Sequence, residues 1–158
     1  IIKAGMLNQF ETIIEPFAAL SLIQLHQIMQ LRQQVFMLEQ HSLYLDADNN
    51  DINATHVMVY DGAKLIAYAR IVPPHLSIPH AQIGRVVVAS AYREQGLGRE
   101  LLQAALDTAQ RQFPQLDVVI AAQTPLQAWY AGFGFVAEGE VFDDGGVEHV
   151  KMRLVHTA

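Results

Sequence analysis

The fold class of this chain follows from Val86-Val-Val-Ala-Ser-Ala-Tyr-Arg-Glu-Gln-Gly-Leu-Gly-Arg-Glu-Leu-Leu102. This stretch reads as a buried strand, a short turn with a glycine pair and the first turn of a helix. Free backbone N–H groups and the helix dipole bind anions at a helix N-terminus, and glycines let the backbone approach a ligand closely. Arg93 and Arg99 would add charge-assisted bonds. The stretch therefore indicates a phosphate site, although an ordinary turn whose glycines only relieve strain explains it equally well.

Two common phosphate-binding motifs do not fit this stretch. A P-loop carries a lysine directly after its last glycine, whereas Arg99 follows Gly98. A Rossmann fingerprint needs a third small residue where Leu101 stands. Its ribose-binding acid should also close the next strand, whereas Asp117 opens it. A phosphate site here must therefore belong to another fold family.

The elements expected around this stretch alternate between helices and strands. Apolar residues from Leu20 to Phe36 recur at helical spacing and predict an amphipathic helix or helix pair. Strands at Thr55 to Tyr60 and Leu65 to Val72 should pair across an Asp61-Gly62 turn. We further expect a central strand at Gln82 to Val88, a helix at Arg99 to Gln112, a strand at Val118 to Ala122, a short helix at Pro125 to Tyr130, and a hairpin of Phe135 to Phe142 with Val147 to Leu154.

Composition excludes several classes of protein. The chain has 158 residues, 51% of them hydrophobic and 16% charged, which predicts one well-packed globular domain. A net charge of −6 without a Lys/Arg cluster argues against nucleic acid or an anionic membrane as partner. The absence of cysteine removes disulfides, thiolate metal sites and cysteine nucleophiles. Without a signal peptide or a long apolar run, we expect a cytoplasmic protein.

Two motifs resemble those of the GNAT N-acetyltransferase superfamily. Arg93-x-x-Gly96-x-Gly98 is similar to its pyrophosphate loop, Gln/Arg-x-x-Gly-x-Gly/Ala. Gln123-Thr-Pro-Leu-Gln-Ala-Trp-Tyr-Ala-Gly-Phe-Gly-Phe135 resembles its second motif, in which a polar residue ends a strand and a Tyr follows on a helix. The resemblance implies an α/β fold, a single GNAT-like domain whose central mixed sheet of about six to seven strands is flanked by about four helices. We place this domain at residues 6–158 and interpret residues 1–5 as a remnant ahead of Met6.

The resemblance also implies acetyl-CoA as the acyl donor. In the family, strands splay beside the central strand, so that pantetheine pairs with backbone amides of that strand. Tyr130 would protonate the leaving thiolate; without the family, a core aromatic beside Trp129 is the simpler interpretation. Gln123 stands where the family often has Asn. The implied acyl-CoA-binding residues are Val86, Val87, Val88, Arg93, Glu94, Gln95, Gly96, Leu97, Gly98, Arg99 and Gln123.

Weaker similarities point to a narrower branch, the ElaA-like GNAT proteins. They are Leu31-Arg-x-x-Val-Phe-x-x-Glu-Gln40, His56, Ala69-Arg70, Ile83-Gly-Arg-Val86 and Asp144-Gly-Gly-Val-Glu-His149. The similarity as a whole covers most of the chain after Leu25. This branch by itself implies no known acceptor.

The general base has no clear position in the sequence. Many GNAT enzymes carry a Glu on the central strand, but the corresponding region holds Gln82, Gly84 and Arg85. Histidine and carboxylate side chains elsewhere, acting directly or through water, remain as candidates: Glu39, His56 and His149. A structural or solvent-facing role explains each of them as well.

Site roles follow from these candidates. We assign Glu39 and His56, with Tyr130, to catalysis, and we assign acceptor binding to three further side chains, Arg70, Arg85 and His149. The two arginines would orient an acidic part of the acceptor or, with equal weight, pair with acids such as Glu39.

Two apparent metal sites are discounted. Asp46-x-Asp48-x-Asn50 imitates a calcium loop, but Asp51 and Val57 replace the Gly and Glu that such a loop needs. We expect a solvated surface loop there, with attraction of a cationic amine as the alternative. His75 and His80 lack a third ligand at helical spacing, so no metal is predicted.

The sequence thus predicts an N-acetyltransferase that moves the acetyl group of acetyl-CoA directly to a primary amine of a small molecule or peptide. A non-catalytic acyl-CoA sensor is an alternative, favoured by the missing strand Glu. A nucleotide-binding regulatory module is another. We expect no nucleic-acid or membrane partner and consider a homodimer as the state of assembly.

Overall fold

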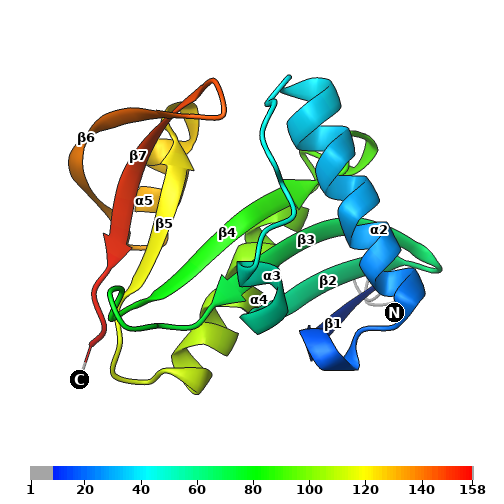
Figure 1. Ribbon diagram of the computed structural model, residues 1–158, viewed down its shortest axis with the longest axis horizontal. Helices are drawn as coiled ribbons and strands as arrows, with labels where there is room; N and C mark the ends of the chain where they lie inside the picture. Colours follow the sequence, from blue (N-terminus) through cyan, green and yellow to red (C-terminus); the bar gives the residue numbers. More distant parts are fainter. Residues whose placement is uncertain (1–8, 158) are drawn as a thin grey trace.

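Seven strands form one mixed sheet in the computed structural model, which describes residues 9–157 (Figure 1). The predicted domain start at Met6 and the remnant at residues 1–5 lie outside the described residues. The strands follow the order β1-β2-β3-β4-β5-β7-β6 across the sheet. Their bounds are β1 Phe10–Pro16, β2 Thr55–Asp61, β3 Lys64–Val72, β4 Ala81–Val88, β5 Val118–Gln123, β6 Val136–Asp144 and β7 Val147–Leu154.

Helices cover both faces of the sheet (Figure 1). The α-helices are α2 Leu22–Arg32, α3 Asn50–Asn53, α4 Leu97–Gln112 and α5 Gln127–Ala131. A π-helical segment, η2 Gln33–Glu39, extends α2, and three short 3-10 turns are η1 Phe17–Ala19, η3 Ser90–Tyr92 and η4 Thr124–Leu126. A reciprocal capping box of Ser21 and Gln24 begins α2, which satisfies two of the backbone N–H groups there.

Alternation along the strands separates two apolar cores. Val57 and Val59 of β2 belong to the core under α4, whereas Met58 and Tyr60 belong to the core under α2. This is the period of two that a strand buried on both faces requires. His56 and Arg70 are opposite each other in the β2–β3 ladder, at the end of the face that α2 covers.

The sheet opens between its two central strands. β4 and β5 run parallel but pair only at Ala81–Val118 and Gln82–Val119. Beyond these pairs the strands diverge, and β5 continues instead with β7 as an antiparallel partner (Figure 1). Among residues 9–157, one edge of β4 is therefore without a strand partner from Ile83 onward.

The expected α/β architecture is confirmed, including both hairpins and the central position of β4. Two elements differ from expectation. Residues Phe10–Pro16, to which the sequence analysis assigned no element, form the edge strand β1 paired with β2, and the polar loop before β2 ends in the single turn of α3. Strand pairing holds β1, and ion pairs of Asp51 with Arg32 and Arg70 hold α3, and a local pattern contains neither.

Candidate active site

A cleft of about 1240 Å³ occupies the opening between β4 and β5. The start of α4, helix α5 and the β6–β7 hairpin contribute to its walls, and so does the segment that links η2 to α3. A volume of this size exceeds that of a typical drug-sized pocket and suits a large, elongated ligand.

The open edge of β4 presents unpaired backbone groups to this cleft. The N–H of Ala89 bonds back to the carbonyl of Ile66 on β3 (2.8 Å), so the backbone groups of Val88 point the opposite way by strand alternation. The carbonyl of Val88 accepts a hydrogen bond from Arg93 Nε (2.9 Å). The N–H of Val88 faces the side on which β4 has no strand partner among residues 9–157, so this N–H is available to a ligand.

The glycine loop begins helix α4 at the cleft. Gly96 is the N-cap residue at φ +78°, a left-handed conformation that favours glycine, and no atom lies within 4 Å of where its Cβ would be. No side chain caps this helix end. Because the first N–H groups of an α-helix have no intrahelical partner, those after Gly96 are free to bind an anion.

The two arginines of this loop differ in how they are held. Besides its bond to Val88, Arg93 forms a two-point contact with Glu39, with nitrogen–oxygen distances of 2.9 and 3.1 Å. Arg99 lies over the ring of Phe133, with 5.2 Å between the guanidinium carbon and the ring centroid. Arg93 thus ties the loop to β4 and η2, while Arg99 retains its hydrogen-bond donors for a ligand.

Tyr130 is a buried residue of α5 that lines the cleft. Trp129 and Phe135 pack against its ring edge to face, at centroid distances of 5.0 and 6.1 Å. Burial raises the pKa of its phenol to about 12. The phenol therefore carries its proton throughout the neutral range and is able to donate it.

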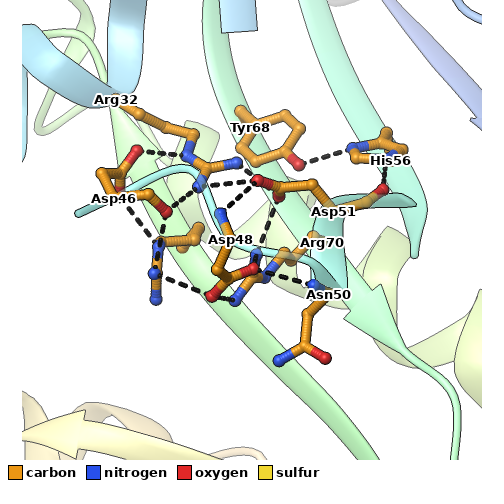
Figure 2. Close-up of polar contacts among 9 residues, drawn as sticks. Arg32, Asp46, Asp48, Asn50, Asp51, His56, Tyr68 and Arg70 are labelled. Atoms are coloured by element: carbon orange, nitrogen blue, oxygen red, sulfur yellow. Dashed lines mark hydrogen bonds and ion pairs between the residues drawn. The ribbon is translucent and has the colours of Figure 1, made fainter. Parts of the chain in front are cut away.

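A network of three arginines and three aspartates lies beside the cleft and lines one of its walls through Asp48, Arg70 and Arg85. Figure 2 shows the polar contacts of this network. Arg32, which is fully buried, donates to Asp46 (2.8 Å) and Asp51 (2.7 Å). Arg70 donates to Asp48 (2.6 and 3.0 Å) and Asp51 (2.8 Å). Arg85 donates to Asp46 (2.9 Å) and to Asp48 (3.3 Å).

The carboxylates of Asp48 and Asp51 are ionised at neutral pH. Burial disfavours the charge of Asp51, but hydrogen bonds from Arg32 and Arg70 hold its pKa below the usual value. Partial burial likewise disfavours the charge of Asp48, but the hydrogen bond from Arg70 and the charges of Arg70 and Arg85 together lower its pKa. The expectation of a solvated acidic loop is therefore wrong: these carboxylates are the counter-charges of buried arginines.

His56 extends the network away from the cleft. Its Nε2 lies 2.9 Å from the carbonyl oxygen of Asp51, which can only accept, so Nε2 carries the proton. Its Nδ1 then accepts from the hydroxyl of Tyr68 (2.6 Å; Figure 2). Both nitrogens are engaged, the side chain is fully buried and it does not line the cleft. His56 is a structural residue here, which corrects its assignment to catalysis.

This fold and cleft agree with a family match. The family model described as "Acetyltransferase (GNAT) domain" matches residues 24–156. The chain belongs to the GNAT family. Membership of this family indicates acyl-CoA-dependent acyl transfer.

Relatives of this GNAT chain include ElaA proteins. Protein ElaA of Escherichia coli is 36% identical over 84% of this chain and 88% of its own length, and its crystal structure superposes with a TM-score of 0.87. A crystal structure of an acyl-CoA N-acyltransferase from Pseudomonas aeruginosa has 37% identity and a TM-score of 0.87 over 91% of this chain and 98% of that one. A GNAT acetyltransferase from Elizabethkingia anophelis with acetyl-CoA bound, 14% identical over 94% and 99% of the two chains, shares the fold at a TM-score of 0.64.

The other predicted site residues of this GNAT chain divide between the cleft and its surroundings. Most of the residues assigned to acyl-CoA line the cleft, but Leu97 points into the core and Gln95 bonds to the carbonyl of Ala91. Gln123 lines the cleft while its amide donates to Gln40 (3.1 Å), which bridges β5 and the end of η2. Glu39 is outside the cleft lining and is held by Arg93, so the structure does not favour it as a base.

His149 is the one predicted base candidate that lines the cleft. Its Nδ1 lies 2.7 Å from the carbonyl oxygen of Val147, so this nitrogen carries the proton. The ring stacks on Phe142. The lone pair of Nε2 is therefore free to accept a proton.

The aspartate network and the cleft residues beside it, Ser42, Tyr44 and Asn50, are not among the site residues predicted from the sequence. A signal for them exists. From Ser42 to Asp48 the even-numbered residues are buried or half-buried and the odd-numbered ones are exposed, so polar side chains face inward while Leu43 and Leu45 face outward. Such an inverted alternation indicates a segment that covers a polar site.

No helix among residues 9–157 is long and apolar enough to cross a membrane. Within the same residues, no cluster of three or more His, Asp or Glu side chains is arranged to hold a metal ion.

Proposed function

We propose that this protein transfers the acetyl group of acetyl-CoA to a primary amine by direct attack of the amine on the thioester. The observation that carries this proposal is the unpaired edge of β4 next to the uncapped, glycine-initiated N-terminus of α4, both on one cleft. Such an edge can pair with the amides of pantetheine as an added strand would. The helix end can bind the pyrophosphate.

Three groups on the cleft account for the chemistry. The N–H of Val88 would polarise the thioester carbonyl and stabilise the oxyanion that forms on attack. As the carbon–nitrogen bond forms and the carbon–sulfur bond breaks, Tyr130 would give its phenolic proton to the departing thiolate. His149 Nε2 would accept the proton that the attacking amine loses. The products are the N-acetylated amine and CoA, and both side chains regain their starting states by exchange with water.

The cofactor half of this proposal is tested by binding. Acetyl-CoA should raise the melting temperature of the protein more than ATP or NAD does, because a ligand that binds only the folded state stabilises it by mass action. Gly96→Asn should weaken acetyl-CoA binding in isothermal titration by roughly tenfold or more, the loss of about one charge-assisted hydrogen bond. Asparagine tolerates the left-handed backbone at Gly96 better than a β-branched residue such as valine does. The Asn variant therefore tests whether a side chain at this position blocks the close approach of the pyrophosphate, with little added backbone strain.

Gly62→Asn provides the matched control. Gly62 also has positive φ (+59°) and open space at its Cβ position, but it lies in the β2–β3 turn outside the cleft. Its substitution should leave acetyl-CoA affinity unchanged. Equal acetyl-CoA affinity of the Gly96 and Gly62 variants would show that the glycine loop does not bind acetyl-CoA. Equal protection by ATP would favour a nucleotide-binding module, and tight acetyl-CoA binding without transfer to any amine would favour a sensor.

A further inference from the structure

The sequence predicts the same acceptor-binding role for Arg70 and Arg85, but the two guanidinium groups differ in the hydrogen-bond donors that they offer to a ligand. Arg70 is nearly enclosed: 6% of its side chain is exposed, and its Nη1 and Nη2 donate to Asp48 and Asp51. Its Nε is the only side-chain nitrogen or oxygen that is buried without a partner among residues 9–157. Arg70 lines the cleft, but both of its terminal nitrogens are bonded within the network.

Arg85 keeps one nitrogen free. Its Nε donates to Asp46 Oδ1, and its Nη2 donates to the carbonyl of Asp46 (3.0 Å) and to Asp48 Oδ2. Its Nη1, with two N–H groups, has no partner among residues 9–157 and is not buried. Because 18% of the side chain is exposed and Arg85 lines the cleft, this nitrogen is open to a ligand.

The neighbouring carboxylate offers no comparable site for a cation. Asp48 Oδ1 accepts from Arg70 Nη1 and from the N–H of Asn50, and Oδ2 accepts from Arg70 Nη2 and Arg85 Nη2. A carboxylate has about four lone-pair sites, so these four bonds leave Asp48 none to give to an ammonium group. The network therefore presents a hydrogen-bond donor, and not an acceptor, to the cleft.

The backbone at Arg85 supports a dedicated role. Arg85 has φ +52°, which non-glycine residues rarely adopt. It lies in a bulge of β4, because Tyr68 pairs with Val87 while Arg70 pairs with Gly84, leaving two residues of β4 opposite one of β3. Such strain persists where the surrounding structure holds it, often at functional sites. The bulge directly precedes Val86 to Val88, where the thioester is proposed to lie.

We propose that the acceptor carries a carboxylate as well as its amine, and that Arg85 Nη1 binds this carboxylate. This inference rests on the proposed acetyl transfer. The three arginines and three aspartates cancel in charge, so recognition depends on the directed hydrogen bond and not on a long-range field. The adjacent Asp46 and Asp48 would repel a phosphate dianion more strongly than a carboxylate, which favours the carboxylate.

Matched acceptor pairs test this proposal. Glycine, β-alanine, γ-aminobutyrate and a dipeptide are each compared with the corresponding primary amide in acetyl transfer, using wild type, Arg85→Gln, Arg85→Lys and Lys151→Gln. Lys151 is another cationic residue that lines the cleft, so its variant removes the same charge elsewhere. Comparing the acid-to-amide ratio of kcat/KM between variants cancels the different intrinsic reactivities of the two amines.

The ratio should fall roughly 10- to 100-fold in Arg85→Gln for at least one pair, as expected for loss of a charge-assisted hydrogen bond. It should fall less in Arg85→Lys and stay at the wild-type value in Lys151→Gln. A purely structural role of Arg85 would lower both rates alike and leave the ratio unchanged, which would overturn the proposal. Isothermal titration with acetyl-CoA confirms that each variant is folded and binds the donor.

A second readout needs neither variants nor turnover. In the wild-type complex with CoA, an acid should raise the melting temperature more than its amide, whereas equal shifts for every pair would contradict the carboxylate site. If acids raise the melting temperature more than their amides do, Arg85→Gln removes this difference and no amine is acetylated, the proposed acetyl transfer is wrong and the proposed carboxylate site is supported. If only amines without a carboxylate are acetylated, the carboxylate site is wrong and acetyl transfer stands.

Discussion

The two walls of the cleft are built in opposite ways. The glycine loop from Arg93 to Arg99 is continuous in sequence, is mostly exposed and offers backbone N–H groups. The aspartate network joins side chains that are 14 to 39 positions apart along the chain, and its central Arg32 has no exposed surface. One wall is a local backbone conformation, and the other exists only once the chain has folded.

This difference predicts separate energetic roles. Because backbone groups at a helix end need no partner to stay in place, the loop can bind a ligand at little cost to the rest of the fold. Buried charges are stable only while every partner is present, so the network couples its wall of the cleft to the stability of the whole domain.

Replacing Arg32 should have the largest effect. Arg32→Met leaves Asp46 and Asp51 without their main counter-charge, and removing one partner of a buried ion pair costs about 3–5 kcal/mol of unfolding free energy. Urea denaturation measures this loss. The affinity of the folded fraction for acetyl-CoA should remain near that of the wild type, because the loop is built independently.

Arg111→Met is the control, since Arg111 is an exposed residue of α4 and its loss should cost within about 0.5 kcal/mol. A cost below about 1 kcal/mol for Arg32→Met would show that the network is not a structural unit. An equal loss of acetyl-CoA affinity would show that the two walls are coupled.

Removing the Tyr130 hydroxyl should have the next largest effect. Tyr130→Phe should lower kcat roughly 10- to 100-fold, the low end of general acid catalysis, since a CoA thiolate is a fairly good leaving group. Acetyl-CoA affinity should stay near the wild-type value, because the lost interaction is made in the transition state. Steady-state kinetics with an accepted amine measures kcat, and isothermal titration measures the affinity for acetyl-CoA.

The control is Tyr60→Phe, which removes a hydroxyl that bonds to Gln27 (2.7 Å) outside the cleft. That variant should retain its kcat. An unchanged kcat in Tyr130→Phe, measured where chemistry limits the rate, would show that the Tyr130 hydroxyl is not the general acid and that the residue serves only in packing.

The smallest effect is a pH dependence of stability that comes from His56. Burial lowers the pKa of its imidazole below the ordinary value of 6.5, so the unfolded chain binds a proton that the folded chain does not. Unfolding free energy should therefore decline as pH falls below 6.5, and decline again below 3.8 as Asp48 and Asp51 become protonated in the unfolded chain.

Urea denaturation at several pH values, from neutral to acidic, tests this assignment with His56→Gln. The variant should lose part of the slope just below pH 6.5 and keep the decline at lower pH. His26→Gln, which removes an exposed histidine of α2, should keep both the slope just below pH 6.5 and the decline at lower pH. An unaltered slope in the His56 variant would place the titration elsewhere.

Much of the fold could be predicted because its signals are local. The turn at Asp61-Gly62 joins two runs of β-formers, and the hairpin it predicts is present. The edge strand β1 could not be predicted with the same ease, because Phe10–Pro16 becomes a strand through its pairing with β2. The π-helical end of α2 is likewise absent from the helical pattern that predicted a helix through Phe36.

Sequence by itself determined the glycine loop, which we propose binds acetyl-CoA, because a glycine with positive φ and a free helix end are properties of a few adjacent residues. It also placed Arg32 in a helical stripe with Ile28, Leu31 and Val35, a position that buries a charge. Only the tertiary structure decided which acids neutralise that charge, since Asp46 and Asp51 reach Arg32 from a distant segment. It likewise decided that Arg85 keeps a free nitrogen while Arg70 is enclosed, because the bonding of each guanidinium depends on partners that meet only after folding.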